Sequence, residues 1–549
     1  MAWSAEFLEA LDVGAAPMFA LDFDFFGMGD FAGYESTKPT LHSHDLEYGT
    51  NAYPHAIAEI SGAGQSVSVG SWSSNAGGLR VRLAGVEVAN YVAQNIPRGL
   101  TCKLMMGFEG LDWYRWGRLG TYVYEGLSGT DNRWTMKLGG LLKVLQSNYN
   151  RESSTSGFGV STSATTLTNL NVTATTGSRD LTMSGSVEEF FAPPLSDGYG
   201  VAKVTASSGS WSEYYIAYES VQKASSGLPP KLLGVQRDLS FFNTTGEDRT
   251  DGGTIYIDGT WPIHIVSGDT ITHVNHVFGS LPDFAKRWLS NVSSGYDPNS
   301  NLGAPIDRSD WDKWANRWRR YGDFTVDYLG EDYEKNGVST LRSIMSKMGA
   351  WIVEHQGRVS WRFAQDLTYE AGAAIEADHI INEDDIISMD KYSIFHPDRK
   401  DQKIQMSWVG LPGFDAPLET RTASIVTQPA TQFQELLTGY IFNDSANNAS
   451  TSNAADASVH LSNRLNPWMR RVPDQLTLNL RGWSWLKMVP GDVVIISCGY
   501  IPDFHDKDTG GVSALEMEHF MVCGVNPNFR DFSVTVEFTR LPRKHNPYL

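Results

Sequence analysis

The chain has 549 residues, 41% of them hydrophobic, and 63 acidic against 44 basic residues give a net charge of −19. This length predicts about three or four domains, and the hydrophobic content excludes wholesale disorder. The acidic balance argues against a nucleic-acid-binding surface, yet it permits a pore along which DNA slides without being held. We find no secretory signal at the N-terminus and no window of about 18 apolar residues, so no membrane span is expected.

The cysteines are few and widely spaced: Cys102, Cys498 and Cys523. They form no CxxC pattern, so neither a disulfide framework nor a zinc site is indicated. Cys498 and Cys523 lie on or beside neighbouring predicted strands, which leaves a disulfide open. Buried free thiols are the favoured interpretation.

The N-terminal part is predicted to be a β domain, residues 1–150. A short helix covers Ser4 to Leu11 with Ser4 as its N-cap, and alternating apolar residues predict a strand from Met18 to Phe26. Further strands are predicted at Ser66–Val69, Leu79–Leu83, Val86–Val88, Cys102–Met106, Trp113–Leu119, Tyr122–Glu125 and Trp134–Leu138, the last running into a short Leu-rich helix at Gly139–Leu145. The polar stretch Gln146 to Ala164 marks a domain boundary.

A second, smaller β unit is predicted over residues 165–260. Its strands lie at Leu167–Val172, Leu181–Met183, Tyr214–Glu219 and Leu232–Arg237, separated by turns rich in Thr, Ser and Gly.

Residues 261–385 change to an α+β pattern. Ser280 caps a helix at Pro282–Val292, Ser309 caps a second helix, and a third runs from Ser339 to Met348, where Gly349 stops it. The second helix carries Trp311, Trp314 and Trp318 on one stripe, which we interpret as a packing or subunit face. A hairpin follows, from Trp351 to Phe363 around the turn His355–Gly357.

The last region, residues 386–549, is again β. An acidic connector, Ala371 to Tyr392, leads to a strand at Lys403–Trp408, a polar loop at Asn443–Asn453 and a helix at Ala454–Asn466. Four strands then follow: Leu476–Leu480, Val493–Ile496 after the tight turn Met488–Asp492, Phe520–Val525, and Phe532–Phe538 after the turn Asn526–Asn528. Four strands joined by turns suggest a small closed or nearly closed antiparallel barrel.

The order of these parts resembles the hub proteins at the tail tip or baseplate of tailed bacteriophages. The C-terminal resemblance is carried by TLNLRGWSWLKMVPGDVV, FMVCGVNPNF and SVTVEFT, in that order after an Ala-rich helix. The N-terminal strand-to-helix passage and the central helix, Gly stop and hairpin resemble the same proteins. YYIAYESV and LLGVQRDL resemble a small insertion domain of some phage tip proteins.

The resemblance implies a mainly β, multidomain fold with an N-terminal hub β-barrel (1–150), a small insertion domain (165–260), an α+β domain (261–385) and a C-terminal hub β-barrel (386–549). It implies a structural virion protein, assembled in the host cytoplasm as a homotrimer, that closes the end of the tail tube and forms part of the DNA-ejection channel. Expected partners are tail or tube proteins above it, and tail-fibre, receptor-binding or spike proteins around or below it. DNA would pass transiently without specific binding.

Candidate chemistry is sparse, and we assign no catalytic, cofactor-binding or metal-binding residue and no cofactor; an enzyme is not expected. The most metal-like cluster is His42-Ser43-His44-Asp45 with His55 nearby, but polar loop histidines explain it better. Carboxylate pairs occur at Asp310/Asp312, Glu331/Asp332 and Glu383–Asp385. A glycosidase needs two carboxylates that flank the bond to be cleaved in the sugar, and spacing in the sequence does not show that these residues are placed in this way. A carbohydrate-binding or glycan-cleaving tail protein is the alternative hypothesis, and a non-viral secreted β protein is a third.

Overall fold

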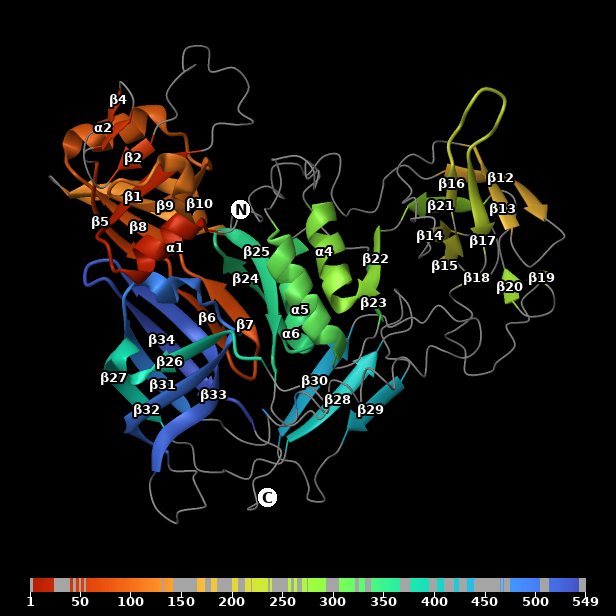
Figure 1. The fold of residues 1–549 in the computed structure, drawn as a ribbon. Helices are drawn as coiled ribbons and strands as arrows, with labels where there is room; N and C mark the ends of the chain where they lie inside the picture. The colour runs from red at the N-terminus through yellow and green to blue at the C-terminus, as the bar shows by residue number, and fades with distance from the viewer. Residues whose placement is uncertain are drawn as a thin grey trace.

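The computed structural model describes residues 3–23, 40–42, 46–48, 51–53, 56–130, 133–141, 165–172, 179–184, 200–205, 213–218, 220–235, 237–238, 255–257, 261–263, 269–273, 275–292, 306–320, 325–330, 337–365, 376–393, 402–408, 419–423, 432–438, 465, 468, 474–503 and 513–542. The fold is mainly β. Figure 1 shows two stacked β units from the two ends of the chain, a central α+β unit beside them and an outlying β unit. In the part that is described, no helix has the length and apolarity to cross a membrane.

The N-terminal unit is a curved antiparallel sheet of seven strands in the order β2-β1-β9-β10-β11-β8-β5. Its strands are β1 (Pro17–Phe23), β2 (Thr40–His42), β5 (Ile57–Gly62), β8 (Leu79–Leu83), β9 (Thr101–Phe108), β10 (Gly117–Thr130) and β11 (Arg133–Gly140), with a small hairpin of β3 (Leu46–Tyr48) and β4 (Asn51–Tyr53) nearby. Helix α1 (Ala5–Asp12) begins at Ser4 as predicted, because the Ser4 hydroxyl accepts the Phe7 N–H at 3.2 Å. The edge strands β2 and β5 do not pair with each other among the described residues, so this part forms an open half-barrel.

Two local predictions in this unit are wrong. The expected strand at Val86–Val88 is the start of helix α2 (Val86–Asn95), because the apolar residues continue at helical spacing and bury Ala89 and Val92 on one face. The expected strand at Trp113–Leu119 begins as a 3₁₀ turn, η1 (Trp113–Arg115), and β10 then runs unbroken from Gly117. The Trp116 indole donates to the Leu111 carbonyl at 3.0 Å and so fixes this turn.

The C-terminal unit is built on an eight-stranded sheet, six strands of which lie in the order β26-β32-β33-β34-β31-β27, while a hairpin from the N-terminal part supplies the other two. Its strands are β26 (His379–Asn382), β27 (Ile386–Ser393), β31 (Gln475–Arg481), β32 (Val493–Asp503), β33 (Ser513–Asn528) and β34 (Ser533–Arg540). The four predicted segments are therefore confirmed as strands, and the turn predicted at Asn526–Asn528 belongs instead to the end of β33. Alternating residues of β31 and β34 fill the interior: Leu476, Leu478, Leu480, Val534, Val536 and Phe538.

The two edges of this sheet meet because one chain segment supplies both of them. Edge strands β26 and β27 are separated only by the 3₁₀ turn η3 (Glu383–Asp385). The described part of the predicted acidic connector thus forms strands, with Ile381 and Ile386 buried in the sheet's interior. Glu383, Asp384 and Asp390 lie on the turn and on the outer face, where water solvates them, so they do not prevent strand formation.

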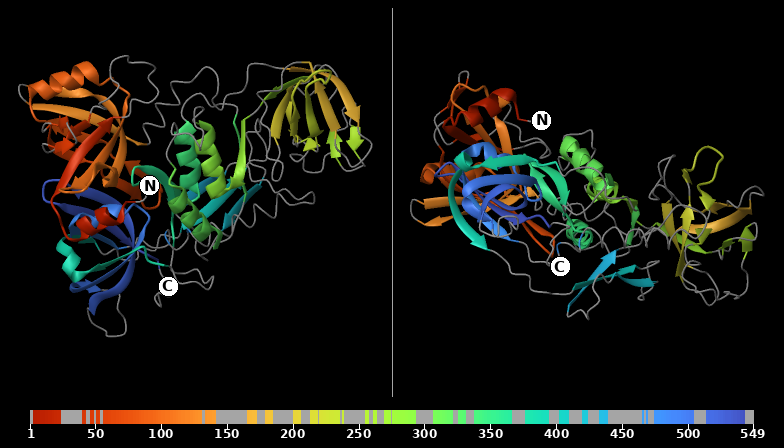
Figure 2. Two further views of the ribbon diagram at one scale, coloured as in Figure 1. Left: turned by 45° about the horizontal axis from the view of Figure 1, so that its top comes forward. Right: turned by 60° about the horizontal axis from the view of Figure 1, so that its bottom comes forward.

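A hairpin from the N-terminal part joins the C-terminal sheet. Strands β6 (Gln65–Ser68) and β7 (Ser73–Ala76) pair with each other, and β6 also pairs with β33 through Ser66 and Gly524. The turn η4 (Trp483–Lys487) contacts the other unit, with the Trp483 ring 5.8 Å from Phe19. The two ends of the chain are therefore packed and hydrogen-bonded to each other, as the views in Figure 2 show from two further directions.

The outlying β unit is an eight-stranded sheet in the order β16-β17-β13-β12-β21-β14-β15-β18. Its strands are β12 (Thr165–Val172), β13 (Arg179–Met183), β14 (Gly200–Thr205), β15 (Glu213–Tyr218), β16 (Ser220–Gln222), β17 (Lys231–Val235), β18 (Arg237–Asp238) and β21 (Thr270–His273), with the hairpin β19 (Ile255–Ile257) and β20 (Trp261–Ile263) beside it. The predicted strands are present, and β21 adds a strand from beyond residue 260. The unit lies away from the other three in each view.

The central unit contains the three predicted helices, α4 (Leu281–Val292), α5 (Arg308–Arg320) and α6 (Gly337–Lys347), and the predicted hairpin of β24 (Ala350–His355) and β25 (Arg358–Phe363). A further pair, β22 (Asn275–Ser280) and β23 (Thr325–Gly330), flanks α4. Helix α5 is capped by Asp307 and not by Ser309, since the Asp307 carboxylate accepts the Asp310 N–H at 3.2 Å. Ser309 lies inside the first turn.

The remaining described strands, β28 (Gln402–Trp408), β29 (Glu419–Ala423) and β30 (Gln432–Thr438), form a separate three-stranded sheet whose β30 contacts α6. The strand predicted at Lys403–Trp408 is confirmed. The predicted helix Ala454–Asn466 lies outside the described residues except for Leu465, which is helical and buried, and the loop Asn443–Asn453 lies outside them entirely.

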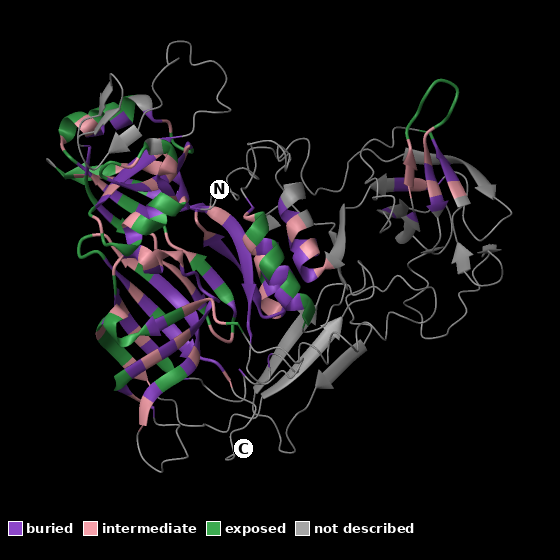
Figure 3. Ribbon diagram, in the orientation of Figure 1, coloured by how far each residue is buried: buried purple, intermediate pink, exposed green. Residues whose placement is uncertain are grey.

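The largest hydrophobic core crosses the boundaries between units. It includes Trp72 from the N-terminal part, Trp351 from β24 and Met521 from β33, together with the inner faces of α4, α5 and α6. Figure 3 shows buried residues concentrated where these units meet. The two end units and the central unit therefore pack as one body.

Candidate functional site

The β24–β25 hairpin lies at the junction of the N-terminal unit, the C-terminal unit and helices α5 and α6. Almost every residue of both strands is buried, including the polar residues Glu354, Ser360 and Arg362. Gln356 and Gly357 in its turn have φ of 50° and 69°, as a two-residue type I′ turn requires. A Cβ at Gly357 would lie 2.9 Å from the Arg118 side chain, so glycine also permits the close approach of β10.

Arg362 on β25 is a charged residue in this core, with a relative exposure of 1%. Its Nε donates to Asp492 Oδ1 at 2.9 Å and its Nη1 to Asp310 Oδ2 at 2.6 Å. The guanidinium also lies 4.4 Å from the Trp314 ring centroid. Two carboxylates from different units thus share one buried cation.

Asp492 belongs to the Pro-Gly-Asp turn before β32. Its Oδ2 accepts the Val489 N–H at 3.1 Å and lies 3.2 Å from His379 Nε2. Burial by itself would raise the pKa of this carboxyl, but the Arg362 charge and the His379 hydrogen bond hold that pKa well below its usual range. The carboxylate is therefore ionised at neutral pH.

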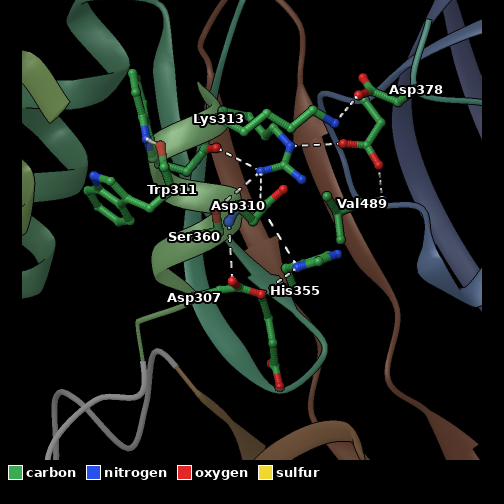
Figure 4. A network of polar contacts seen from close by, with 12 residues as sticks. Asp307, Asp310, Trp311, Lys313, His355, Ser360, Asp378 and Val489 are labelled. Carbon is green, nitrogen blue, oxygen red and sulfur yellow. Dashed lines mark hydrogen bonds and ion pairs between the residues drawn. The ribbon is translucent and has the colours of Figure 1, made fainter. Parts of the chain in front are cut away.

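Asp378, just before β26, makes the second link (Figure 4). It accepts from Lys313 Nζ at 2.7 Å and from Arg317 Nη1 at 3.0 Å, both on α5, and from the Val493 N–H at 3.0 Å. Arg317 in turn lies 4.8 Å above the Trp314 ring. Asp378 therefore links helix α5 to the start of β32, since its carboxylate accepts from two side chains of the helix and from the Val493 backbone N–H.

At the hairpin turn, His355 Nδ1 lies 2.9 Å from Asp307 Oδ2, which joins the turn to the N-cap of α5. Burial would raise the pKa of Asp307, but the hydrogen bonds from His355 and the Asp310 N–H, with the charges of His355 and Arg358, lower it to about 2. The cap is therefore a carboxylate at neutral pH.

Glu354 fixes the hairpin to the N-terminal unit. Its Oε1 accepts the Thr121 N–H at 2.7 Å, and its own backbone N–H and C=O bond the Gln65 side chain at 3.0 and 2.8 Å. Burial is the largest influence and raises the pKa of Glu354 to about 7, against the lowering effect of the Thr121 N–H, Arg118 and the Leu141 N–H. Burial therefore brings the pKa of this carboxyl close to neutrality.

These groups bind one another and make a rigid joint, by which we mean the β24–β25 hairpin together with Asp310, Asp378 and Asp492. Lys313, Arg317 and Arg362 of the central unit pair with Asp378 and Asp492 of the C-terminal unit, so that moving either unit would break ion pairs in a low-dielectric environment. Glu354 links the same hairpin to the N-terminal unit, so the hairpin connects the two end units.

The candidate residues from the sequence are dispersed. His42 ends β2, while Ser43, His44, Asp45 and His55 lie outside the described residues, as do Glu331 and Asp332. No group of three metal-ligating side chains occurs within the described part of the chain. Asp310 belongs to the Arg362 network, Asp312 lies 3.5 Å from Lys286, and Glu383 accepts the Gly499 N–H at 2.9 Å.

The tryptophan stripe and the cysteines match their simpler interpretations. Trp311, Trp314 and Trp318 are all buried in the central core, where the last two meet Phe363 edge-on. The three cysteines are free and buried, so the favoured interpretation of free thiols is confirmed.

Sequence reasoning missed Arg362, Asp492 and Glu354 as a connected set. One signal was present: Arg362 stands between the aromatic residues Trp361 and Phe363. A charge buried among aromatic residues needs a buried partner. The partners, Asp310 and Asp492, lie 52 and 130 positions away, so the sequence alone does not identify them.

No protein-family model matches the chain, and no curated protein matches its sequence. Among solved structures, the 43 kDa tail protein of prophage MuSo2 from Shewanella oneidensis overlays with a TM-score of 0.33 at 9% identity, covering 96% of this chain and 100% of that one. Prophage tail protein gp18 from Listeria monocytogenes EGD-e gives 0.30 at 8% identity, covering 95% and 94%. A chain of the virion of the native gene transfer agent particle gives 0.16 at 10% identity, covering 48% and 82%. At these TM-scores the overlays do not establish a shared fold, and nothing below rests on them.

Proposed function

We propose that this chain is a structural protein of a phage or phage-like tail: a hub at the tail tip or baseplate that closes the end of the tail tube. The observation that carries the proposal is the fixed pairing of two β units from opposite ends of the chain, held together by β6 on β33 and by the β24–β25 joint. The sequence resemblance to hub proteins predicts such a pair of units in one subunit.

The physical logic concerns ring building. Two similar β units per subunit, held at a constant angle, let three copies present six units around one axis, and an interface that closes in this way makes a finite ring. The edge strands that leave backbone groups unpaired within the subunit, β2 and β5, supply pairing surfaces for a neighbouring copy. In this proposal the net charge of −19 keeps passing DNA from binding to the wall.

The proposal includes partners: a tube or distal tail protein above the ring, and fibre, receptor-binding or spike proteins around or below it. It places the chain in the virion after assembly in the host cytoplasm and gives it no catalytic role. The alternative is a glycan-binding or glycan-cleaving tail protein, in which exposed tryptophan rings would contact the sugar. The stripe of Trp311, Trp314 and Trp318 lies in the core, where a sugar has no access.

The test is imaging of the purified full-length chain by single-particle electron microscopy, with mass measured by light scattering. We expect three-copy rings with pseudo-sixfold appearance. Antibody labelling of the parent particle should mark one end of the tail only. Monomers at high concentration together with labelling along the whole tail, or with no labelling, would overturn the proposal.

A further inference from the structure

A half-buried arginine without an acidic partner stands out in this acidic chain. Arg342 on α6 donates to the Ser74 carbonyl of β7, and within the described part of the chain no carboxylate forms an ion pair with it. Burial lowers the pKa of this guanidinium. A cation removed from water without a counter-charge is costly, so its position favours an anion beside it.

Two cavities adjoin Arg342. The smaller, of about 260 Å³, is lined by Trp72, Ser73, Ser74, Ser339, Arg342, Ser343, Ser346 and Trp351. Hydroxyl groups and one guanidinium therefore surround it, with no carboxylate in its wall. The larger, of about 390 Å³, includes Arg80 and Lys137, and its carboxylate, Glu125, lies 3.5 Å from Lys137. Positive charge thus exceeds negative charge in both walls.

Two residues of the smaller cavity carry unsatisfied polar atoms. The Nε1 of Trp72 and the Oγ of Ser74 are buried and have no hydrogen-bond partner among the described residues. Trp72 is 1% exposed and Ser74 6%, so the residues themselves are almost fully enclosed. Both atoms have less than 1 Å² of accessible surface, so they lie within the wall, and the donors that a bound group could reach are those of Arg342 and of the exposed serines.

We propose that the smaller cavity is a binding site for an oxyanion, either inorganic phosphate or a carboxylate group. The site would join β7 of the N-terminal part to α6 of the central unit, because its wall comes from both. Since one water molecule occupies about 30 Å³, the cavity holds a tetrahedral oxyanion together with a few waters. Arg342 supplies the charge, and the exposed hydroxyls of Ser73 and Ser343 in the same wall supply donors.

The experiment titrates the full-length chain with sodium phosphate or sodium acetate, against sodium chloride at matched ionic strength, and follows the melting temperature and the heat of binding. We expect saturable binding of at least one oxyanion, which Arg342→Met weakens by about tenfold or more. Arg319→Met, which removes an exposed arginine of α5, is the control and should leave binding unchanged. A response to phosphate alone or to acetate alone identifies the kind of group.

A second variant keeps the test decisive if Arg342→Met does not fold. Ser346 lies four residues after Arg342, on the same helix face, so Ser346→Asp places a carboxylate within reach of the guanidinium. We expect this variant to melt higher than the wild type without added anion and to lose the response to phosphate and acetate. The inference is overturned if neither anion binds the wild type, or if Arg342→Met and Arg319→Met respond alike. The hub proposal is independent of either result.

Discussion

Removal of the Arg362 guanidinium tests the central joint most directly. Arg362→Met keeps the aliphatic stem and deletes the charge, which leaves Asp310 and Asp492 without their shared cation; their side chains are 11% and 5% exposed. Breaking a buried ion pair by removing one partner costs about 3–5 kcal/mol. We expect a loss at the upper end of that range, because two carboxylates and not one lose their partner.

Hydrogen–deuterium exchange measures this loss where it occurs. The amides of β25, of Val493 and of Val522, which donates to the Asp492 carbonyl, should exchange about two to four orders of magnitude faster, since about 1.4 kcal/mol corresponds to a factor of ten. Amides of the outlying β unit should exchange as in the wild type, because that unit makes none of these contacts. Arg319→Met, on the exposed side of α5, is the matched control and should change nothing measurable.

The pH dependence of stability provides a second test, because the direction of the change is fixed by the pKa of Asp492. In the wild type the pKa of Asp492 is depressed, so its contribution to stability is present above the unfolded pKa and is lost as pH falls through the folded pKa. In Arg362→Met burial is no longer offset by the guanidinium, so the pKa of that carboxyl is expected to rise. The difference in stability between the two proteins should therefore shrink below about pH 4.

The double variant Arg362→Met with Asp492→Asn separates the cost of losing the ion pair from the cost of changed side-chain packing. Neutralising the stranded carboxylate should restore part of the loss, about 1 kcal/mol or more, so the two substitutions are not additive. The reasoning fails if Arg362→Met changes exchange at β25 less than tenfold, or if the double variant is less stable than the sum of the two single variants predicts.

Three further outcomes are expected. The raised pKa of Glu354, about 7 against 4.5, means that its contribution is fully present below pH 4.5 and is lost as pH rises through 7; the loss is about 3 kcal/mol and should disappear from pH-dependent melts of Glu354→Gln. Gly491→Ala should lower stability by about 1–3 kcal/mol in thermal melts, because φ is 109° and the added Cβ would lie 2.6 Å from Arg362 Cβ; an unchanged melting temperature would contradict this. Burial raises the pKa of Cys523 to about 12, and Cys498 is 2% exposed; both thiols should resist a thiol reagent until the protein unfolds, and rapid labelling of the native protein would refute this.

Local patterns predicted the central unit well because its signals are contained in short windows. The apolar face of α6, with Leu341, Ile344, Met345 and Met348 all buried, follows from periodicity alone. The hairpin turn at Gly357 follows from glycine's tolerance of positive φ. The four strands predicted after residue 475 in the C-terminal sheet also follow from patterns within short windows.

Long-range pairing was not predictable in this way. Nothing local in Gln65–Ser68 indicates that it hydrogen-bonds β33, more than four hundred residues away, and the acidic residues around Glu383 conceal that their neighbours are edge strands. The segment at Val86 forms a helix although Val86-Glu87-Val88 alternates as a strand would, because three residues fit either period and only the continuation to Val92 decides for a helix. The buried charge of Arg362 could be noticed but not matched to its partners.

The joint contains buried charged side chains at positions that apolar residues could also fill. An apolar set of similar volume often gives equal or greater stability than a buried ion network, so stability alone does not account for Arg362 and its carboxylates. The stacked rings of Trp72 and Trp351, 5.6 Å apart at 7°, already supply buried area but tolerate sliding, whereas hydrogen bonds from one guanidinium to two carboxylates tolerate little. We infer that the ions set the angle between the end units. A double variant of Arg362 and Asp492 that recovers stability but no longer forms three-copy rings would support this inference, and one that recovers both would contradict it.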